Sequence, residues 1–353
     1  MTETFPLIEL TGAPKERGIA HGRALTDQIK ANVELYLYMA ANMARVDRDT
    51  AFDTADKFQP ALQTHAPHLL EEMRGIAQGA GVSLTEILFL NARTEVLALG
   101  ASTGECTAIG ITPSRTASGH TLLAQNWDWH HTLTQSTAIF HIRPDNGPNM
   151  LILTEAGQVG KIGLNEFGVG VVLNILVAET VEFGIPVHVM LRQIVECPSA
   201  RAARDMVMQT PKASASHFLI ADASGDLYGL ELTGQNAAEL KPDNGMLFHT
   251  NHYCNPDMTA GDIGRLLFLD SEPRYNRAQK LLAEKTKWQA DDLKMLYTNH
   301  EDGPASICRH VDPSMPDYMH MATIAGVIMD LNTKTMLATC SQPCQNEYRE
   351  YKL

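Results

Sequence analysis

The pattern of apolar residues changes near residue 100, and this change constrains the fold more than any other feature of the sequence. Before it, apolar residues recur at spacings of three and four, which is typical of one face of a helix. The clearest run predicts a long helix through Leu25, Ile29, Val33, Tyr36, Ala40 and Met43. A second predicted helix carries Leu69, Leu70, Met73, Ile76 and Ala77. The first hundred residues therefore read as mainly helical.

A capping box predicts where a third helix begins. In Ser83-Leu84-Thr85-Glu86, the Ser83 hydroxyl can accept from the Glu86 amide while the Glu86 side chain reaches back to residue 83. We expect this helix to run to about Leu99 and to end at Gly100.

After residue 106, short strand-like runs separated by turn signals dominate. The predicted strands are Thr107–Thr112, Thr121–Ala124, Ala138–Ile142, Met150–Thr154, Val169–Leu173, His217–Ala221, Leu227–Leu232, Met246–His249, Ile324–Asp330 and Thr335–Ala338. The predicted helices among them are Ile185–Glu196, Ala200–Gln209, Arg274–Glu284 and Ala290–Thr298. Runs of strands followed by runs of helices favour a layered α+β fold over a parallel α/β sheet.

Composition excludes several classes of partner. The chain has 353 residues and a net charge of -13, whereas nucleic acids and anionic membranes select basic surfaces. The N-terminus has neither the basic start nor the apolar run of a secretory signal, and no stretch of about 18 apolar residues occurs. We therefore expect a cytoplasmic protein without nucleic-acid or membrane partners.

The six cysteines are too few to form a disulfide scaffold in a chain of this length. Cys340 and Cys344 have a C-x3-C spacing, but no second pair completes a tetrahedral zinc site. Reduced structural thiols are the favoured interpretation of this pair.

Cys106 lies where the helical region gives way to the first predicted strand, in Gly104-Glu105-Cys106-Thr107. Most free cysteines are small buried hydrophobic residues, and position alone does not distinguish such a cysteine from a nucleophile. The surrounding motifs change that balance.

Six segments resemble, in order, the acyl-coenzyme A:6-aminopenicillanic-acid acyltransferase family of autoproteolytic cysteine N-terminal-nucleophile hydrolases. They are Glu105-Cys106-Thr107, Gln125-Asn126-Trp127-Asp128, Thr154-Glu155-Ala156-Gly157, Gly160-Lys161-Ile162-Gly163, His249-Thr250-Asn251-His252 and Ser306-Ile307-Cys308-Arg309. The resemblance extends from about residue 12 to residue 340. Any one motif is weak evidence, whereas six in order are strong.

The resemblance implies a four-layer αββα N-terminal-nucleophile hydrolase sandwich, built as one domain over residues 1–353. It also implies a precursor that cuts itself between Glu105 and Cys106. The cut would separate a mainly helical segment, 1–105, from a segment, 106–353, that starts with the nucleophile. The family's usual residue before the cysteine is Gly, and Glu105 departs from that pattern, which affects the expected rate of cleavage more than its position.

The chemistry of such a cut follows from one residue. The Cys106 thiol attacks the Glu105 carbonyl, and hydrolysis of the thioester frees the Cys106 α-amino group. That amine has an ordinary pKa of about 7.7–8.0, which suits a general base at neutral pH. Cys106 would then supply both nucleophile and base, as N-terminal threonine enzymes do, with no cofactor.

Four further residues receive roles through the resemblance. Asn251 would donate its side-chain amide to the oxyanion, and Asp128 would orient the Cys106 amine. Arg309 would bind a substrate carboxylate, and Ser216, in the matched segment Ala215-Ser216-His217-Phe218, would also bind substrate. Asn251, Asp128 and Arg309 each have a plain structural interpretation as well: a backbone-bonding amide, a turn carboxylate and a surface salt bridge.

The expected function is therefore cysteine-dependent hydrolysis or transfer of the acyl group of a small amide, by two fragments that stay associated and that can form a homo-oligomer. Two alternatives remain at this point. One is a metal-dependent hydrolase built on Asp128 with His130, His131, His249 or His252. If the last two lie on a strand, their H-x-x-H spacing directs them to opposite faces, which disfavours a shared ion. The other alternative is a binding protein on the same fold that is never cleaved.

Overall fold

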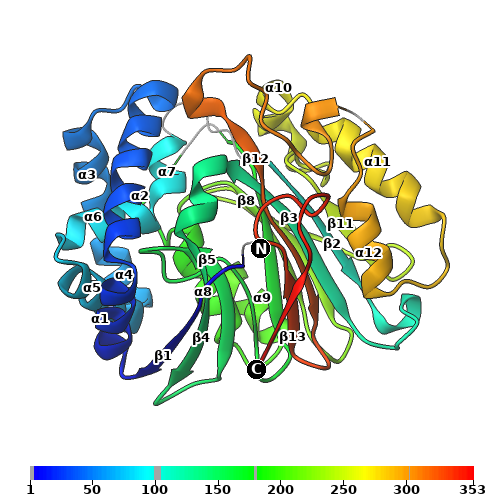
Figure 1. Cartoon of the computed structure of the whole chain (residues 1–353), viewed down its shortest axis with the longest axis horizontal. Helices are drawn as coiled ribbons and strands as arrows, with labels where there is room; N and C mark the ends of the chain where they lie inside the picture. The colour runs from blue at the N-terminus through cyan, green and yellow to red at the C-terminus, as the bar shows by residue number, and fades with distance from the viewer. Residues whose placement is uncertain (1–3, 99–104, 179–180, 302) are drawn as a thin grey trace.

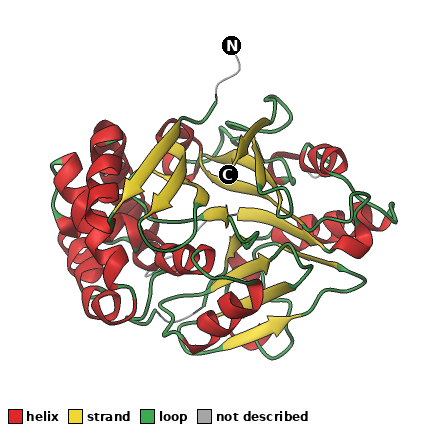
Figure 2. Ribbon diagram, turned by 90° about the horizontal axis from the view of Figure 1, so that it is seen from below, coloured by secondary structure: helices red, strands yellow, loops and turns green. Residues whose placement is uncertain are grey.

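The molecule is built from four layers, in the order helices, sheet, sheet, helices (Figure 1). The structure is a computed structural model that describes residues 4–98, 105–178, 181–301 and 303–353. Viewed at 90° to Figure 1, the strands occupy the middle of the molecule, with helices at its sides (Figure 2). This arrangement is the αββα sandwich of N-terminal-nucleophile hydrolases that the sequence predicts.

One inner layer is an eight-stranded sheet with the order β1-β4-β5-β6-β7-β8-β9-β10. Its edge strand β1 runs parallel to β4, and every other neighbouring pair is antiparallel. The strands are β1 (Leu7–Gly12), β4 (Thr137–Pro144), β5 (Met150–Glu155), β6 (Ile162–Asn165), β7 (Gly170–Ile175), β8 (Ser216–Ala221), β9 (Leu227–Leu232) and β10 (Ala237–Leu240).

The other inner layer is a six-stranded antiparallel sheet with the order β11-β2-β3-β12-β13-β14. The strands are β2 (Glu105–Ile111), β3 (Leu122–His130), β11 (Met246–His249), β12 (Met321–Asp330), β13 (Thr335–Ala338) and β14 (Arg349–Lys352). Cys106 is therefore the second residue of an interior strand, with neighbours on both sides.

Helices cover the outer face of each sheet. On the eight-stranded sheet lie α1 (Pro14–Ala24), α2 (Thr26–Met39), α3 (Arg48–Asp56), α4 (Gln59–His65), α5 (Pro67–Ala80), α6 (Leu84–Asn91), α7 (Arg93–Leu97), α8 (Val187–Val195) and α9 (Ala200–Gln209). On the side of the six-stranded sheet lie α10 (Gly264–Leu267), α11 (Ser271–Ala283) and α12 (Ala290–Tyr297). None of the described helices is both long and apolar enough to cross a bilayer.

Side chains along β2 point alternately to the helical layer and to the space between the two sheets. Ile109 and Ile111 pack with Ala278, Leu282 and other residues of the layer formed by α11 and α12. Ala108 belongs to the core between the sheets, and a Cβ on Gly110 would lie 2.6 Å from Leu227 of β9. Because successive strand residues point to opposite faces, the Cys106 side chain shares the inter-sheet face with Ala108.

Most predicted elements are present at their predicted positions. The capping box is confirmed: the Glu86 amide donates to Ser83 Oγ at 3.2 Å, and the Ser83 amide donates to Glu86 Oε2 at 2.7 Å. The helix that it begins ends at Asn91 and is followed by α7, which ends at Leu97, so the single helix predicted to continue to Leu99 is wrong. Leu99 and Gly100 lie outside the described residues.

Strand β3 extends six residues past the predicted end at Ala124. The added part of the strand carries the polar residues Gln125, Asn126 and Asp128, and all three are buried. Gln125 exchanges hydrogen bonds with the Leu173 backbone at 2.7 and 2.9 Å, and Asn126 Nδ2 donates to the Tyr297 carbonyl at 3.0 Å. Buried polar groups with partners carry no desolvation penalty large enough to break the strand.

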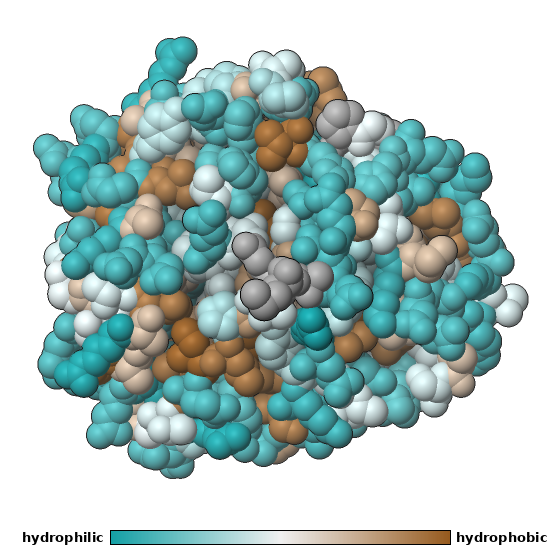
Figure 3. Space-filling model, in the orientation of Figure 1, coloured by the Kyte–Doolittle hydropathy of each residue, from teal (hydrophilic) through white to brown (hydrophobic). Residues whose placement is uncertain are grey.

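The face of the molecule in Figure 3 is mostly hydrophilic, and hydrophobic side chains appear on it in scattered patches. The most exposed large apolar residues are Leu266 and Leu269, each 78% exposed, in and after α10.

Candidate active site around Cys106

Side chains from three other elements hold the backbone of Cys106. Its amide nitrogen donates to Asn251 Oδ1 at 2.9 Å. Its carbonyl oxygen accepts from Arg274 Nη1 at 2.8 Å and from Asn174 Nδ2 at 2.9 Å. These contacts fix both ends of the residue without help from the residues that precede it.

The Cys106 thiol is buried and faces a small cavity. The cavity measures about 10 Å³, enough for about one water molecule. Its lining consists of Arg93, Cys106, Trp127, Asp128, Trp129, Lys161, Leu173 and Ile175. Burial, and secondly the Asp128 carboxyl, raise the pKa of the thiol to about 11 against the opposing influence of the Asp128 backbone amide and Lys161. In this conformation the thiol is protonated at neutral pH and closed to an acyl substrate.

Asp128 lies on the strand next to Cys106, opposite the residue before it. In the β2–β3 register Asp128 pairs with Glu105, whereas Cys106 pairs with Trp127, so the Asp128 carboxyl and the thiol project from opposite faces of the sheet. Asp128 Oδ1 accepts from Thr323 Oγ1 at 2.6 Å, and Oδ2 lies 3.8 Å from Arg309 Nε. Burial raises the pKa of Asp128 to about 8, against the influence of Arg274 and Thr323.

Asn251 is oriented by contacts at both ends of its amide group. Its Oδ1 accepts from the Cys106 nitrogen and from Arg274 Nη2, the latter at 3.0 Å, and its Nδ2 donates to the Ile175 carbonyl at 2.9 Å. Its own backbone nitrogen donates to Ser271 Oγ at 2.7 Å. The donors around Oδ1 and the acceptor beside Nδ2 fix which atom is oxygen, and one of the two Nδ2 hydrogens is used by Ile175.

Arg274, on α11, is a member of the site that the sequence analysis missed. It is fully buried, bridges the Cys106 carbonyl and Asn251, and donates through Nε to Asp270 Oδ2 at 3.0 Å. The sequence does contain a signal, because Arg274 precedes Ala278 and Leu282 by one and two helical turns and so lies on the apolar face of the helix. A charged residue at such a position needs a buried partner.

A second missed group places two cations beside the thiol cavity. Glu155 Oε1 pairs with Arg93 Nη2 at 2.8 Å and with Lys161 Nζ at 3.2 Å, and Glu155 Oε2 accepts from the Tyr36 hydroxyl. Lys161 Nζ also lies 4.1 Å from the centre of the Trp127 ring. Burial, and secondly the positive charge of Arg93, lower the pKa of Lys161 to about 7 against the opposing influence of Glu155. The Gly160-Lys161-Ile162-Gly163 motif was noted in the sequence, but it gave no reason to connect Lys161 with Cys106.

The two predicted substrate-binding residues lie in different places. Arg309 is beside Asp128 and also pairs with Asp270, and burial lowers its pKa to about 10. Ser216 begins β8 directly opposite Ile175, a residue of the cavity lining. Residues directly opposite each other on paired strands project from the same face of the sheet, so the buried Ser216 hydroxyl lies on the same face as the Ile175 side chain. That hydroxyl has no hydrogen-bond partner among the described residues.

The histidines considered for a catalytic metal have other partners. His130 Nδ1 contacts Thr132 Oγ1 at 2.8 Å, and its Nε2 contacts the Asp317 carbonyl at 3.0 Å. The His131 amide donates to the His320 carbonyl at 3.0 Å. Within the described part of the chain, the clusters of residues able to hold an ion do not include Asp128. The geometry gives the metal-dependent alternative no site at Asp128.

The pair His249 and His252 corrects one expectation. Strand β11 ends at His249, so the two rings do not project to opposite faces but stack with centres 6.5 Å apart. His249 Nε2 contacts Glu231 Oε1 at 2.8 Å, and His252 Nδ1 contacts Ser271 Oγ at 2.8 Å. Because Glu231 also accepts from the backbone amides of residues 254 and 255, its oxygens are occupied without an ion.

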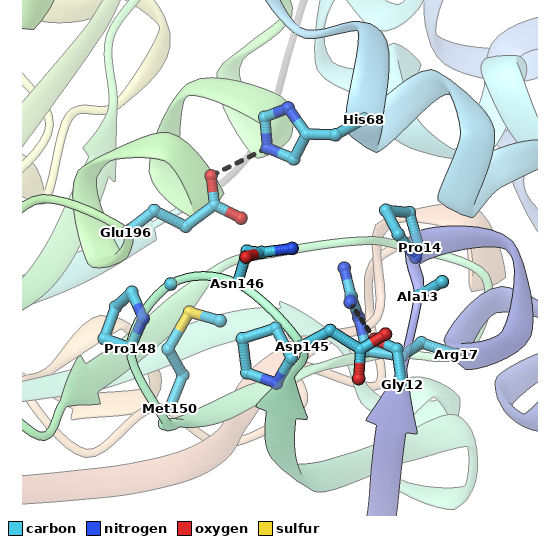
Figure 4. A pocket seen from close by; sticks show the side chains of 12 residues that line it. Gly12, Ala13, Pro14, Arg17, His68, Asp145, Asn146, Pro148, Met150 and Glu196 are labelled. Carbon is cyan, nitrogen blue, oxygen red and sulfur yellow. Dashed lines mark hydrogen bonds and ion pairs between the residues drawn. The ribbon is translucent and has the colours of Figure 1, made fainter.

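A larger surface pocket lies away from this chemistry. It measures about 340 Å³, and Figure 4 shows His68 hydrogen-bonded to Glu196 on one side and Arg17 on the other. The side chains that line it within the described chain include no cysteine, serine or threonine, so it offers no nucleophile for acyl transfer.

Comparison with known proteins decides the family. Residues 114–345 match the family described as acyl-coenzyme A:6-aminopenicillanic acid acyl-transferase, which is more than half of the chain. The chain belongs to this family. The matched segment contains Asp128, Ser216, Asn251 and Arg309 and begins eight residues after Cys106.

Individual relatives agree with the family and with the fold. The acyl-coenzyme A:6-aminopenicillanic-acid-acyltransferase 40 kDa form of Emericella nidulans is 29% identical over 308 residues, covering 86% of this chain and 84% of that protein. Among solved structures, a variant of conjugated bile acid hydrolase from Clostridium perfringens superposes with a TM-score of 0.51 at 14% identity. It covers 70% of this chain and 97% of that chain. The family member described here is thus an enzyme, a hydrolase of amide C–N bonds or an N-acyltransferase.

Proposed function

We propose that the chain cuts itself between Glu105 and Cys106 and then uses Cys106 as an N-terminal nucleophile to hydrolyse or transfer the acyl group of a small amide. The observation that carries this proposal is the support around the Cys106 backbone. Asn251 holds its nitrogen, while Arg274 and Asn174 hold its carbonyl. A residue held at both ends by side chains stays in place when the peptide bond before it breaks.

Self-cleavage needs one rearrangement and one hydrolysis. The Cys106 sulfur attacks the Glu105 carbonyl carbon, and the thiol proton passes to the departing Cys106 nitrogen. The peptide C–N bond breaks as the thioester forms. Water then cleaves the thioester, which leaves a carboxylate on Glu105, a thiol on Cys106 and a free α-amino group.

Turnover reuses the same sulfur with the new amine as base. The amine removes the thiol proton, the sulfur attacks the acyl carbonyl, and the leaving amine of the substrate takes the proton. The acyl group is carried as a thioester on Cys106 until water or an acceptor amine attacks it. The positive charge of Lys161 beside the cavity favours the thiolate and so opposes the rise in the thiol pKa that burial causes.

Asp128 and Asn251 act on the nitrogen and the oxyanion in this proposal. Asp128, on the nitrogen side of the strand, stabilises the α-ammonium form and orients the amine. Asn251 holds that nitrogen through Oδ1, and its side-chain Nδ2 group donates to the oxyanion when the acyl group is attacked.

Arg309 and Ser216 serve the substrate. Arg309 carries a buried positive charge beside Asp128, which suits a substrate carboxylate, and the Ser216 hydroxyl contributes polarity next to Ile175. The named relative transfers acyl groups from acyl-coenzyme A to 6-aminopenicillanic acid, so a coenzyme A thioester is one donor class to test on this chain. Other small amides are tested alongside it, because the apolar residues Leu173, Ile175 and Trp127 in the cavity lining do not select one acyl group.

The proposal also covers the state of the molecule. Residues 1–353 form one domain, the fragments 1–105 and 106–353 remain associated, and the protein acts in the cytoplasm. Helix α2 packs through Tyr36 onto Glu155 of β5, a buried contact between the two fragments that separation would expose.

The test is capture of the acyl-enzyme. Protein mixed with a panel of small amides and acyl thioesters is quenched in acid, and the masses of its fragments are measured. We expect fragment 106–353 to gain the mass of the acyl group and to lose it on treatment with hydroxylamine. Cys106→Ser provides the control, because an ester in place of the thioester resists hydroxylamine at neutral pH. An acyl adduct on any other residue, or turnover by Cys106→Ala, contradicts the mechanism.

A further inference from the structure

Four side chains with metal-binding atoms lie close together in the C-terminal part of the chain, about 200 residues after Cys106 in the sequence. His300, Cys308 and His310 lie on the segment after α12, and Cys344 lies between β13 and β14. One ligand atom from each lies within 4.8 Å of all the others. His300 Nε2 is 3.0 Å from His310 Nε2, which is 3.3 Å from Cys344 Sγ.

These separations resemble the edges of a tetrahedral zinc site. Zn–N bonds of about 2.0–2.1 Å and Zn–S bonds of about 2.3 Å place neighbouring ligand atoms about 3.3 to 3.8 Å apart. The two shortest separations are at or below this range, and the upper bound of 4.8 Å exceeds it by about 1 Å. Side-chain adjustments of this size bring the four atoms around one ion.

Protons alone satisfy this cluster poorly. His310 Nε2 faces both His300 Nε2 and Cys344 Sγ, yet a neutral ring nitrogen either donates one proton or accepts one. A single cation can accept electron pairs from all three atoms at once.

We propose that His300, Cys308, His310 and Cys344 bind one zinc ion. Two thiolates and two imidazoles are the donors of structural zinc sites, and thiolate ligands disfavour magnesium and calcium. Four protein ligands complete the coordination, so the ion has no open position for a substrate. The site is structural and independent of the Cys106 mechanism.

The ion would fasten two segments next to the active site. Cys308 is followed by Arg309, which pairs with Asp128 and Asp270, and Asp270 in turn pairs with Arg274. In the sequence analysis, Cys344 was considered only together with Cys340, and both were interpreted as structural thiols. The spacing His300-x7-Cys308-x-His310 supplies the other ligands, and Cys340 is not one of them.

Cobalt substitution tests the site by its ligands. The full chain, purified with a reductant and stripped of metal, is titrated with Co²⁺ and then with Zn²⁺. We expect saturation at one Co²⁺ per chain, with a thiolate-to-cobalt charge-transfer band and the strong visible bands of tetrahedral cobalt. Zinc should displace the cobalt, remove these bands and raise the unfolding temperature.

Matched variants locate the ligands. Cys344→Ser should abolish the charge-transfer band of its sulfur. It should also weaken zinc binding more than loss of a residue that only supports a ligand does, which costs about 10- to 100-fold in affinity. Cys197→Ser, which replaces another partly exposed thiol, should bind like the wild type. His300→Ala, a change at an exposed side chain, provides a second ligand deletion if Cys344→Ser does not fold.

Two results overturn the proposal. One is zinc binding by Cys344→Ser and His300→Ala that equals wild-type binding. The other is the absence of tetrahedral cobalt bands from the wild-type chain after reduction of all its thiols.

Discussion

Two substitutions of Asn251 separate its two roles. Its Oδ1 accepts two hydrogen bonds, from the Cys106 nitrogen and Arg274, and its Nδ2 donates one to the Ile175 carbonyl. Asn251→Ala removes these contacts between the described residues. Asn251→Asp keeps both acceptor contacts, with the new charge next to Arg274, but it removes every side-chain donor.

The structure predicts that the two variants differ in stability but lose catalytic activity to the same extent. At about 1 kcal/mol for each hydrogen bond, Asn251→Ala should lose about 3 kcal/mol of unfolding free energy and Asn251→Asp about 1 kcal/mol. If Asn251 donates to the oxyanion, both variants lose the same transition-state contact. Both should then show kcat lowered about 10²–10³-fold, with a smaller change in KM.

The assay combines urea unfolding with kcat and KM for any amide substrate found by the acyl-enzyme screen. Activity is normalised to the amount of fragment 106–353, so that incomplete processing is not mistaken for slow turnover. Near-wild-type kcat in Asn251→Asp would refute the donor role and leave Asn251 as a residue that positions the Cys106 nitrogen.

Three further outcomes follow from the charges around Cys106. Asp128→Asn should slow processing, turnover or both while the fold is retained, and unchanged rates in both assays would reduce Asp128 to a structural residue. The pKa of Asp128 is about 8 in the folded chain against an ordinary 3.8, so the folded state binds the extra proton between about pH 4 and 8. Asp128 therefore lowers the unfolding free energy as pH rises through this window, and urea unfolding of Asp128→Asn at pH 5 and pH 8 should show a smaller decline than the wild type shows. Lys161→Met removes a charge that lowers the thiol pKa, so alkylation of Cys106 by iodoacetamide at pH 6, where Lys161 is protonated, should slow about three- to tenfold, whereas Lys212→Met should leave it unchanged.

The layered fold was predictable because its signals are local and periodic. Ala200–Gln209, Leu227–Leu232, Met246–His249 and Thr335–Ala338 begin and end where the sequence places them. The elements that were missed have little apolar periodicity. They include β14, whose sequence REYK is mostly exposed, and β1, a sheet edge within a region that reads as helical.

The site was less predictable because its contacts join residues far apart in sequence. Cys106 and Asn251 stand 145 positions apart and Cys106 and Arg274 168 apart, so periodicity cannot pair them. Family motifs supplied Cys106, Asp128 and Asn251. Arg274 and Asn174 are in none of those motifs, and only the folded chain shows that they bind the Cys106 carbonyl.

The direct test of self-cleavage is the mass of freshly purified protein under denaturing conditions. The account predicts two chains, 1–105 and 106–353, that co-elute as one particle under native conditions and whose summed mass exceeds that of the intact chain by one water. Cys106→Ala should give a single uncut chain of full length that is inactive. A wild-type protein that remains one intact chain while fully active would contradict the proposal that Cys106 acts as an N-terminal nucleophile.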